Sequence, residues 1–450
     1  MRLPRTDRGR LALVLALAAA VTVFTATVPL LRDWFDLRVY YGTVDSWTHH
    51  GGRIYDYRVP GTTYGFTYPP FAAVVMLPMA LVDLHVAIAV TLLLNLAALA
   101  VALRVLAGRA WHRHGWYGCA LVACGLALFE PLRDTFSFGQ VNILLLALVL
   151  LDCRLLASGR SRWAGVGIGL AAAIKLTPAA FIGLLLVARR WRAAAVATAV
   201  AAGATALAAW AAPDASRFYW THAMWDTTRV GRLDYVSNQS LQGILARLDV
   251  SSRAVWAVVV LLVLGVWAAR TRRAVVAGDW TAAFALTGLT ACLVSPITWV
   301  HHLVWLLPSF AVLVRAGRLR IAGALYAVLC TSVVWLWFDD ASGVDGFLGS
   351  NAYAWITLGL LLWLPVGHPG VYGSTLPRVT SDTAPAPIPA APAIAKASGQ
   401  PAAPSGSTAA TTGTFTGPGL GLARKASSDP TGSTRPAAPN PQSSSSPASS

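Results

Sequence analysis

The sequence predicts an all-α polytopic membrane protein with about twelve transmembrane helices, within a range of roughly ten to thirteen. Hydrophobic residues make up 56% of the 450-residue chain and charged residues only 12%, with a mean hydropathy of +0.58. About a quarter of the residues in a soluble domain are charged. Apolar runs long enough to cross about 30 Å of hydrocarbon recur through roughly the first 370 residues. Short arginine clusters separate these runs, as in the cytoplasmic loops of membrane proteins.

The composition also argues against two other classes of protein. The net charge of +16 comes almost entirely from arginines between apolar runs, so we expect no nucleic-acid partner. The five cysteines lie mainly within apolar stretches and lack metal-ligand spacing. We therefore expect neither a disulfide nor a metal site.

Arginine clusters orient the predicted helices, because such clusters stay on the cytoplasmic side. The first cluster precedes the apolar run 11–31, which is longer than a signal-peptide core of about 7 to 15 residues and is read as a transmembrane helix. Placing every cluster inside gives a consistent alternation of sides. The segments predicted to face outward are 32–68, 131–139, a short break at 175–178, 212–251, 295–300 and 339–352.

The predicted membrane segments follow from this alternation. They are 11–31, 69–107, 116–130, 140–157, 164–176, 178–188, 193–211, 254–269, 280–296, 301–315, 321–338 and 353–367. The run 69–107 is too long for one helix, and we interpret it as a short embedded piece followed by one span. The segments on either side of Thr177 are short for a bilayer and suggest a broken or re-entrant pair.

A second region begins near residue 371, where the chain becomes rich in Ala, Pro, Ser, Thr and Gly. Such a composition buries too little apolar surface to offset chain entropy. We expect a membrane-embedded domain over residues 1–370 and a disordered cytoplasmic tail over residues 371–450. Both termini are then cytoplasmic.

Acidic residues follow directly on the first predicted helix, at Asp33, Asp36 and Asp45. Asp36 sits where membrane meets water. A carboxylate there is either a solvated or capping group, or a general base that takes a proton from an acceptor hydroxyl. The same loop ends in Tyr68-Pro69-Pro70, which predicts either a rigid interfacial turn or an aromatic platform for a sugar ring or a prenyl chain.

Other polar groups interrupt apolar sequence at predicted outward ends. Lys175 is one of three lysines and lies at membrane depth, which favours contact with a lipid phosphate over snorkelling to the interface. Amide side chains suit sugar hydroxyls because they both donate and accept hydrogen bonds. We expect phosphate or sugar contacts rather than metal binding from the histidine pair. The residues concerned are Gln140, Asn142, Asn238, Gln239, His301 and His302.

These residues together resemble glycosyltransferase family 87, the polyprenol-phosphate-mannose-dependent alpha-(1-2)-mannosyltransferases. The resemblance runs in order through six short segments between about residues 30 and 310. They are Asp36-Leu37-Arg38-Val39-Tyr40, Phe66-Thr67-Tyr68-Pro69-Pro70, Gly139-Gln140-Val141-Asn142, Lys175-Leu176-Thr177-Pro178, Ser237-Asn238-Gln239-Ser240, and Ser295 to His302. One departure is Val300, where relatives are expected often to have a polar residue.

The resemblance implies a GT-C type bundle in the plasma membrane, with its active site on the extracytoplasmic face. It implies that Asp36 is the catalytic base, and that Lys175 and the histidine pair hold the donor phosphate or the acceptor. Arg38, Tyr40 and the remaining polar residues of the segments are expected to contact substrate. The implied reaction is inverting and needs no metal or other cofactor.

The implied partners are a polyprenyl-phosphate mannose donor, a glycolipid acceptor and membrane lipids. The acceptor is a phosphatidylinositol mannoside, a lipomannan or a lipoarabinomannan. A prenyl-phosphate-dependent arabinofuranosyltransferase remains an alternative within the family. A transporter or flippase is less favoured, because the polar motifs crowd one face and no internal repeat is evident.

Overall fold

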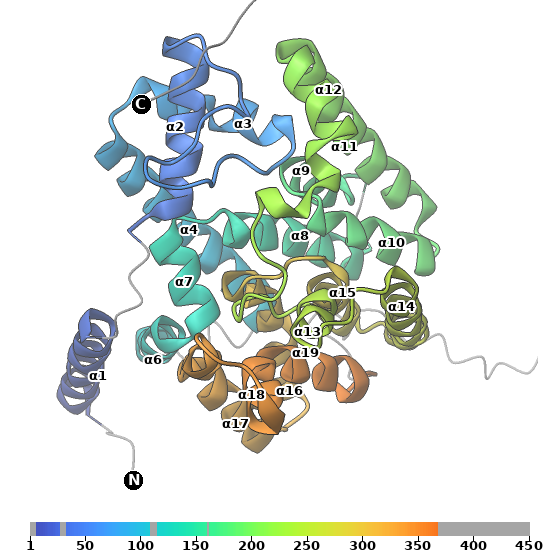
Figure 1. Cartoon of the computed structure of the whole chain (residues 1–450). Helices are drawn as coiled ribbons and strands as arrows, with labels where there is room; N and C mark the ends of the chain where they lie inside the picture. Colours follow the sequence, from blue (N-terminus) through green and yellow to red (C-terminus); the bar gives the residue numbers. More distant parts are fainter. Residues whose placement is uncertain (1–5, 28–32, 109–114, 160–161, 368–450) are drawn as a thin grey trace, which may run out of the picture. The chain divides into compact units, whose positions relative to one another are not determined.

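The computed structural model describes residues 6–27, 33–108, 115–159 and 162–367. Secondary structure in these ranges is helical, and the one β contact is an isolated bridge between Arg58 and Gly65. The α-helices of the first half are α1 (Asp7–Thr27), α2 (Phe35–His49), α3 (Pro70–Met76), α4 (Leu84–Ala107), α6 (Gly115–Leu128), α7 (Glu130–Phe138), α8 (Asn142–Ala157), α9 (Val166–Ile174), α10 (Ala180–Val187) and α11 (Trp191–Ala211) (Figure 1).

Shorter helices dominate the second half. It contains α12 (Pro213–Thr221), α13 (Leu241–Arg247), α14 (Arg253–Val276), α15 (Trp280–Val294), α16 (Leu307–Arg315), α17 (Leu319–Cys330), α18 (Gly343–Ser350) and α19 (Ala352–Trp363). The 3₁₀ helices are η1 (Leu77–Leu81), η2 (Thr177–Ala179), η3 (Ala223–Trp225), η4 (Thr227–Arg229), η5 (Val300–Leu306) and η6 (Val333–Trp337).

In the described part of the chain, four helices are long and apolar enough to cross a membrane, namely α1, α4, α11 and α14. A fifth span is formed if α6 and α7, which are bent by 76° at their junction, are counted together. Many large apolar side chains on these helices are exposed, including Leu93 at 66% and Leu261 at 67%. This is the surface expected of a protein that meets lipid. The count of about twelve helices stays a prediction, since six further apolar helices have only 10–17 residues.

The structure adds helices where the sequence predicted outward segments without assigned secondary structure. The segment 32–68 contains α2, whose buried residues Leu37, Val39, Tyr40 and Val44 pack inward. The segment 131–139 belongs to α7, because Pro131 stands in its first turn, where a missing N–H costs nothing. Segment 212–251 likewise contains α12 and α13.

The predicted interruption near Thr177 is present. Helix α9 ends at Ile174, Lys175 is extended with φ −146° and ψ 133°, and η2 follows before α10 begins. Pro178 lies in the first turn of η2, where proline is compatible with a helix start. A short helical piece, α3 followed by η1, also precedes the long helix α4 as predicted, and its embedding in the membrane stays a prediction.

Helix α15 is buried along nearly its whole length, from Trp280 to Leu293. A helix that is apolar on all sides is expected at the centre of a bundle, and α15 packs against α14, α16, α19 and η5. Small residues such as Ala282, Ala283 and Gly288 allow this close approach.

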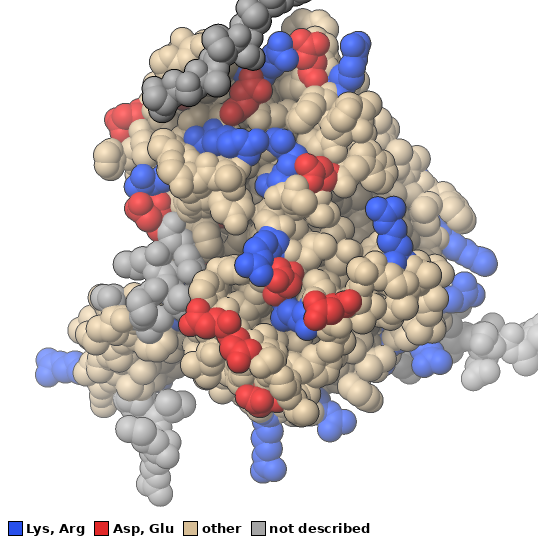
Figure 2. Space-filling model, in the orientation of Figure 1, with Lys and Arg blue, Asp and Glu red and all other residues tan. Residues whose placement is uncertain are grey.

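On the face shown in Figure 2, acidic and basic side chains occur together, with wide uncharged areas between them. The predicted tail 371–450 and its boundary lie outside the described residues.

Candidate active site

A close contact between α2 and the end of α7 brings Asp36 to the site. Gly139 ends α7 in the left-handed region, with φ 70°, and a Cβ atom there would lie 2.6 Å from the Cβ of Leu37. The Trp34 N–H donates to the Ser137 carbonyl at 2.9 Å across the same contact. Only glycine satisfies both the backbone angle and this spacing, so Gly139 sets how closely Gln140 approaches Asp36.

Asp36 and Gln140 begin a chain of hydrogen bonds. Gln140 donates from Nε2 to Oδ2 of Asp36 at 2.7 Å, and its Oε1 accepts from the Tyr68 hydroxyl at 2.8 Å. Tyr40 donates its own hydroxyl to that of Tyr68 at 2.9 Å. Because Tyr68 is the donor to Oε1, the amide of Gln140 can present only its N–H group to the carboxylate.

Lys175 forms the other end of the network. Its Nζ donates to the Tyr68 hydroxyl at 3.2 Å and to Oδ1 of Asn142 at 2.9 Å, and it lies 2.9 Å from Nε2 of His302. The ammonium group also stands 4.9 Å from the centre of the Tyr68 ring. Lys175 is only 9% exposed. Within the described part of the chain, no carboxylate forms a salt bridge with it.

The two histidines are consecutive residues of η5 and contact different partners, because successive residues of a 3₁₀ helix are rotated by about 120°. Their rings meet edge to face, with centroids 4.6 Å apart. His302 faces Lys175, and its Nδ1 accepts from the Trp299 N–H at 3.1 Å. His301 packs its ring against Phe138, and its carbonyl accepts from Nδ2 of Asn142 at 3.2 Å. The histidine pair is thereby tied to the same network by two routes.

Burial governs the ionisation of the groups at the Asp36 end. Loss of solvation raises the pKa of Asp36 to about 6, although the hydrogen bond from Gln140 and the charge of Lys175 oppose the rise. Burial likewise raises the pKa of Tyr68 and of Tyr40 above the usual range. At neutral pH the site therefore holds an ionised carboxylate beside two protonated phenols.

The structure brings seven of the predicted site residues into this one network, with His301 beside it. The seven are Asp36, Tyr40, Tyr68, Gln140, Asn142, Lys175 and His302. Arg38 is not among them, since it forms a surface ion pair with Asp33 at 2.8 Å.

Asn238 and Gln239 also lie outside the network, and both are fully buried. Asn238 bonds to Pro296 and Thr298, and Gln239 bonds to the Ser350 carbonyl and the Ala354 N–H. These contacts join the segment before α13 to the loop before η5 and to the start of α19. In the structure both amides hold elements together, and their contact with substrate stays a prediction.

Sequence reasoning missed Glu130, the only glutamate in the chain. Its carboxyl group is fully buried and accepts from the Tyr353 hydroxyl and, at 2.7 Å, from Nε1 of Trp335. Glu130 therefore joins the start of α7 to η6 and α19. The sequence could have indicated this residue, because a lone glutamate at the end of an apolar run lies at membrane depth. An acidic group there needs a specific partner.

Among the described residues there is no group of three His, Cys, Asp or Glu side chains that could hold a metal ion. The donors gathered at the site are amides, phenols, one amine and one imidazole. Such groups are suited to hydroxyls and to a phosphate.

The chain is similar in sequence to known proteins. The sequence model of glycosyltransferase family 87 matches residues 66–296. A polyprenol-phosphate-mannose-dependent alpha-(1-2)-phosphatidylinositol mannoside mannosyltransferase of Mycobacterium tuberculosis (strain ATCC 25618 / H37Rv) is 36% identical over 67% of this chain and 72% of its own length. A polyprenol-phosphate-mannose-dependent alpha-(1-2)-phosphatidylinositol pentamannoside mannosyltransferase of the same species (strain CDC 1551 / Oshkosh) is 32% identical, over 74% of this chain and 79% of its own length. No solved structure matches the chain.

Proposed function

The chain belongs to glycosyltransferase family 87, and from this premise we propose that it transfers mannose from polyprenyl-phosphate mannose to a glycolipid acceptor through an alpha-(1-2) linkage. The observation that carries the proposal is the placement of Asp36 and Lys175 at opposite ends of one hydrogen-bond network. This arrangement supplies a base at one end and a cation at the other. A base can activate the acceptor hydroxyl in a sugar transfer from a lipid phosphate, and a cation can stabilise the leaving phosphate.

The acceptor in this proposal is a phosphatidylinositol mannoside or a lipomannan or lipoarabinomannan built on it. The names of the relatives support the first of these, since they include phosphatidylinositol mannoside and phosphatidylinositol pentamannoside mannosyltransferases. Their identities to this chain, 36% and 32%, are too similar to decide between the two acceptors.

The chemistry is an inverting displacement. Asp36 takes the proton of the acceptor hydroxyl, and the oxygen attacks the anomeric carbon of a beta-mannosyl phosphate. The bond from that carbon to the phosphate oxygen breaks, which leaves an alpha linkage and polyprenyl phosphate. Gln140 holds Oδ2 of Asp36, so Oδ1 is the oxygen left to face the acceptor.

Lys175 and His302 lie where the leaving phosphate can be stabilised. The lysine is buried and held by neutral partners, Asn142 and Tyr68, so the phosphate would be its counter-ion. A monophosphate that leaves on a lipid gains less charge than a nucleoside diphosphate does. We therefore propose that these side chains suffice without a metal ion.

We further propose a GT-C type bundle with its active site on the extracytoplasmic face. The support is the arginine pattern, which puts the loops that carry Asp36, Lys175 and His302 on the side opposite the basic clusters. Polyprenyl-phosphate sugars used at that face need no nucleotide in the outer compartment.

The test is mannose transfer from radiolabelled polyprenyl-phosphate mannose to phosphatidylinositol mannosides in membranes that carry the chain. Asp36→Asn is expected to lower the rate by about 10² to 10⁴ at matched expression. Asp45→Asn is the matched control, because Asp45 lies on the same helix but pairs with His49 and His50. Full activity of Asp36→Asn would remove this residue from the mechanism, and absence of wild-type transfer would overturn the proposed donor.

A further inference from the structure

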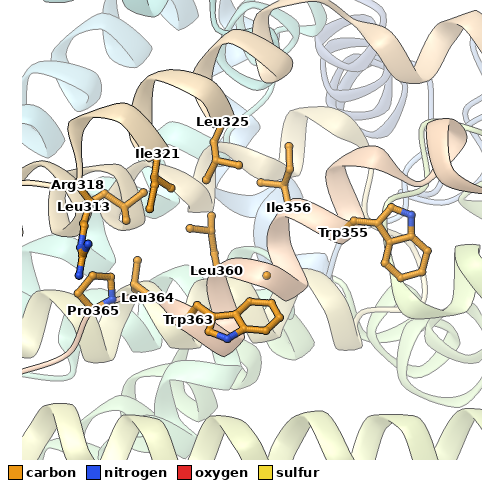
Figure 3. Close-up of a pocket in the computed structure, with 11 residues that line it drawn as sticks. Leu313, Arg318, Ile321, Leu325, Trp355, Ile356, Leu360, Trp363, Leu364 and Pro365 are labelled. Carbon is orange, nitrogen blue, oxygen red and sulfur yellow. The ribbon is translucent and has the colours of Figure 1, made fainter.

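An apolar groove lies between α17 and α19, and Leu313 of α16 also lines it. Helix α17 packs against α16 and helix α19 packs against α15, which leaves the space between α17 and α19 open. The groove has a volume of about 640 Å³. Figure 3 shows side chains from α16, α17 and α19 pointing into the groove. Its lining includes Leu313, Ile321, Leu325, Ile356, Leu360 and Trp363.

One charged side chain lines the groove, and it stands at one end. Figure 3 shows Arg318 beside Leu313 and Pro365, with Trp355 at the far end. Within the described residues no carboxylate forms a salt bridge with Arg318. Arg270 already has hydrogen-bond partners, because its guanidinium donates to the carbonyl of Leu362 in α19 and to that of Leu364 directly after the helix. The groove is thus apolar along its length and cationic at one end.

An apolar groove on a membrane protein fills with hydrocarbon, because water there would be unpaired and an empty space would lose dispersion contacts. We propose that the groove holds an acyl chain of an anionic phospholipid whose phosphate binds Arg318. A zwitterionic lipid would fill the groove equally well but would gain less from the uncompensated guanidinium. The charge at the end, rather than the apolar wall, therefore selects the lipid.

The polyprenyl chain of the donor is the alternative occupant of the groove. The charge at Arg318 favours the phospholipid over this chain. Its phosphate belongs with Lys175 in the catalytic network, and the rest of a polyprenyl chain offers nothing anionic to Arg318. Arg318 and Arg320 belong to a basic cluster that the arginine pattern places on the cytoplasmic side. The proposed phospholipid is thus one of the cytoplasmic leaflet, and its binding is independent of mannose transfer.

The test is native mass spectrometry of the full chain released from nanodiscs of phosphatidylcholine and phosphatidylglycerol in equal amounts. The wild type is expected to retain phosphatidylglycerol in preference to phosphatidylcholine. Arg318→Ala is expected to reduce that preference about fivefold. Arg320→Ala is the matched control, since Arg320 is an exposed arginine of the same segment that does not line the groove.

A second variant separates the groove from the charge. Gly359 lines the groove, and a Cβ atom there would meet only Trp363, at 3.9 Å. Gly359→Leu should therefore fold, fill the groove and lower the retention of both phospholipids. Equal retention of the two lipids by the wild type, no retained lipid, or a retained prenyl lipid that Arg318→Ala leaves in place would each overturn the proposal, whatever the transferase activity.

Discussion

The carboxyl group of Asp36 has the environment of a base that works near neutral pH. Burial raises its pKa to about 6, while Gln140 and Lys175 limit the rise. A carboxyl group with an ordinary pKa near 4 would be a weaker base. Asp36 stays ionised at pH 7 and yet accepts a proton more readily than a solvated aspartate.

The rate of transfer should therefore fall as pH drops through about 6. Only the ionised form of Asp36 accepts the proton, and one unit below the pKa about a tenth of the group is ionised. Initial rates between pH 4.5 and 8 should show a loss of about tenfold at pH 5, and Asp45→Asn should keep the same midpoint. A midpoint near pH 4 would contradict the environment described for Asp36.

Gln140 is expected to act by positioning Asp36. Gln140→Ala removes the N–H that fixes Oδ2, and a base displaced by about 1 Å can cost about 10² in rate. Steady-state kinetics should show a lower kcat with a nearly unchanged KM for the donor. In the wild type the hydrogen bond from Gln140 lowers the pKa of Asp36. The variant loses this bond, so the pH midpoint of the rate should rise. Gln242→Ala, on α13, is the control variant. An unchanged pH midpoint in Gln140→Ala would contradict the proposal that Gln140 positions Asp36.

At the scale of elements, the α2–α7 contact depends on Gly139. Gly139→Ala would put a methyl group within 2.6 Å of the Leu37 side chain and force a left-handed alanine. The backbone alone costs about 1–2 kcal/mol, and α2 must move away from Gln140. Thermal unfolding in detergent and the transfer assay should both show losses. Gly203→Ala, where nothing lies within 4 Å of the added atom, should cause neither loss.

Glu130 joins α7 to η6 and α19. Glu130→Ala leaves the Tyr353 hydroxyl and the Trp335 N–H without their acceptor, at a cost of about 1–3 kcal/mol for each buried donor. Denaturant unfolding in detergent should show this loss. Glu130→Gln keeps one acceptor oxygen and should lose less. Equal stability of Glu130→Ala and the wild type would contradict the role of this junction.

At the scale of the whole molecule, the arginine pattern predicts the side of the membrane on which each loop lies. Ser342 and Arg320 are both exposed and belong to segments predicted on opposite sides. A membrane-impermeant maleimide should label Ser342→Cys in intact cells and label Arg320→Cys only after permeabilisation. The wild type is the control for labelling of the native cysteines. Labelling of Arg320→Cys but not of Ser342→Cys in intact cells would show that the proposed topology is inverted.

The sequence by itself determined the helical, apolar character of a membrane protein and the polar residues from which the candidate site is drawn. Hydropathy, arginine clusters and prolines are local properties of the sequence, so their structural effects can be predicted without knowledge of the tertiary structure. The break beside Lys175 and the short piece before α4 were predictable for this reason. The helices α2, α12 and α13 were not predicted, because their apolar faces are short and are completed only by packing.

Only the tertiary structure decided which polar side chains meet. Asp36, Tyr68, Gln140, Lys175 and His302 come from five separate segments, and their contacts depend on close approaches such as that at Gly139. The sequence does not distinguish the amides of Gln140 and Gln239, yet Gln140 donates to Asp36 and Gln239 joins buried loops. The reason is physical: a side chain's type states which hydrogen bonds it can form, and the packed backbone decides which partner is within reach.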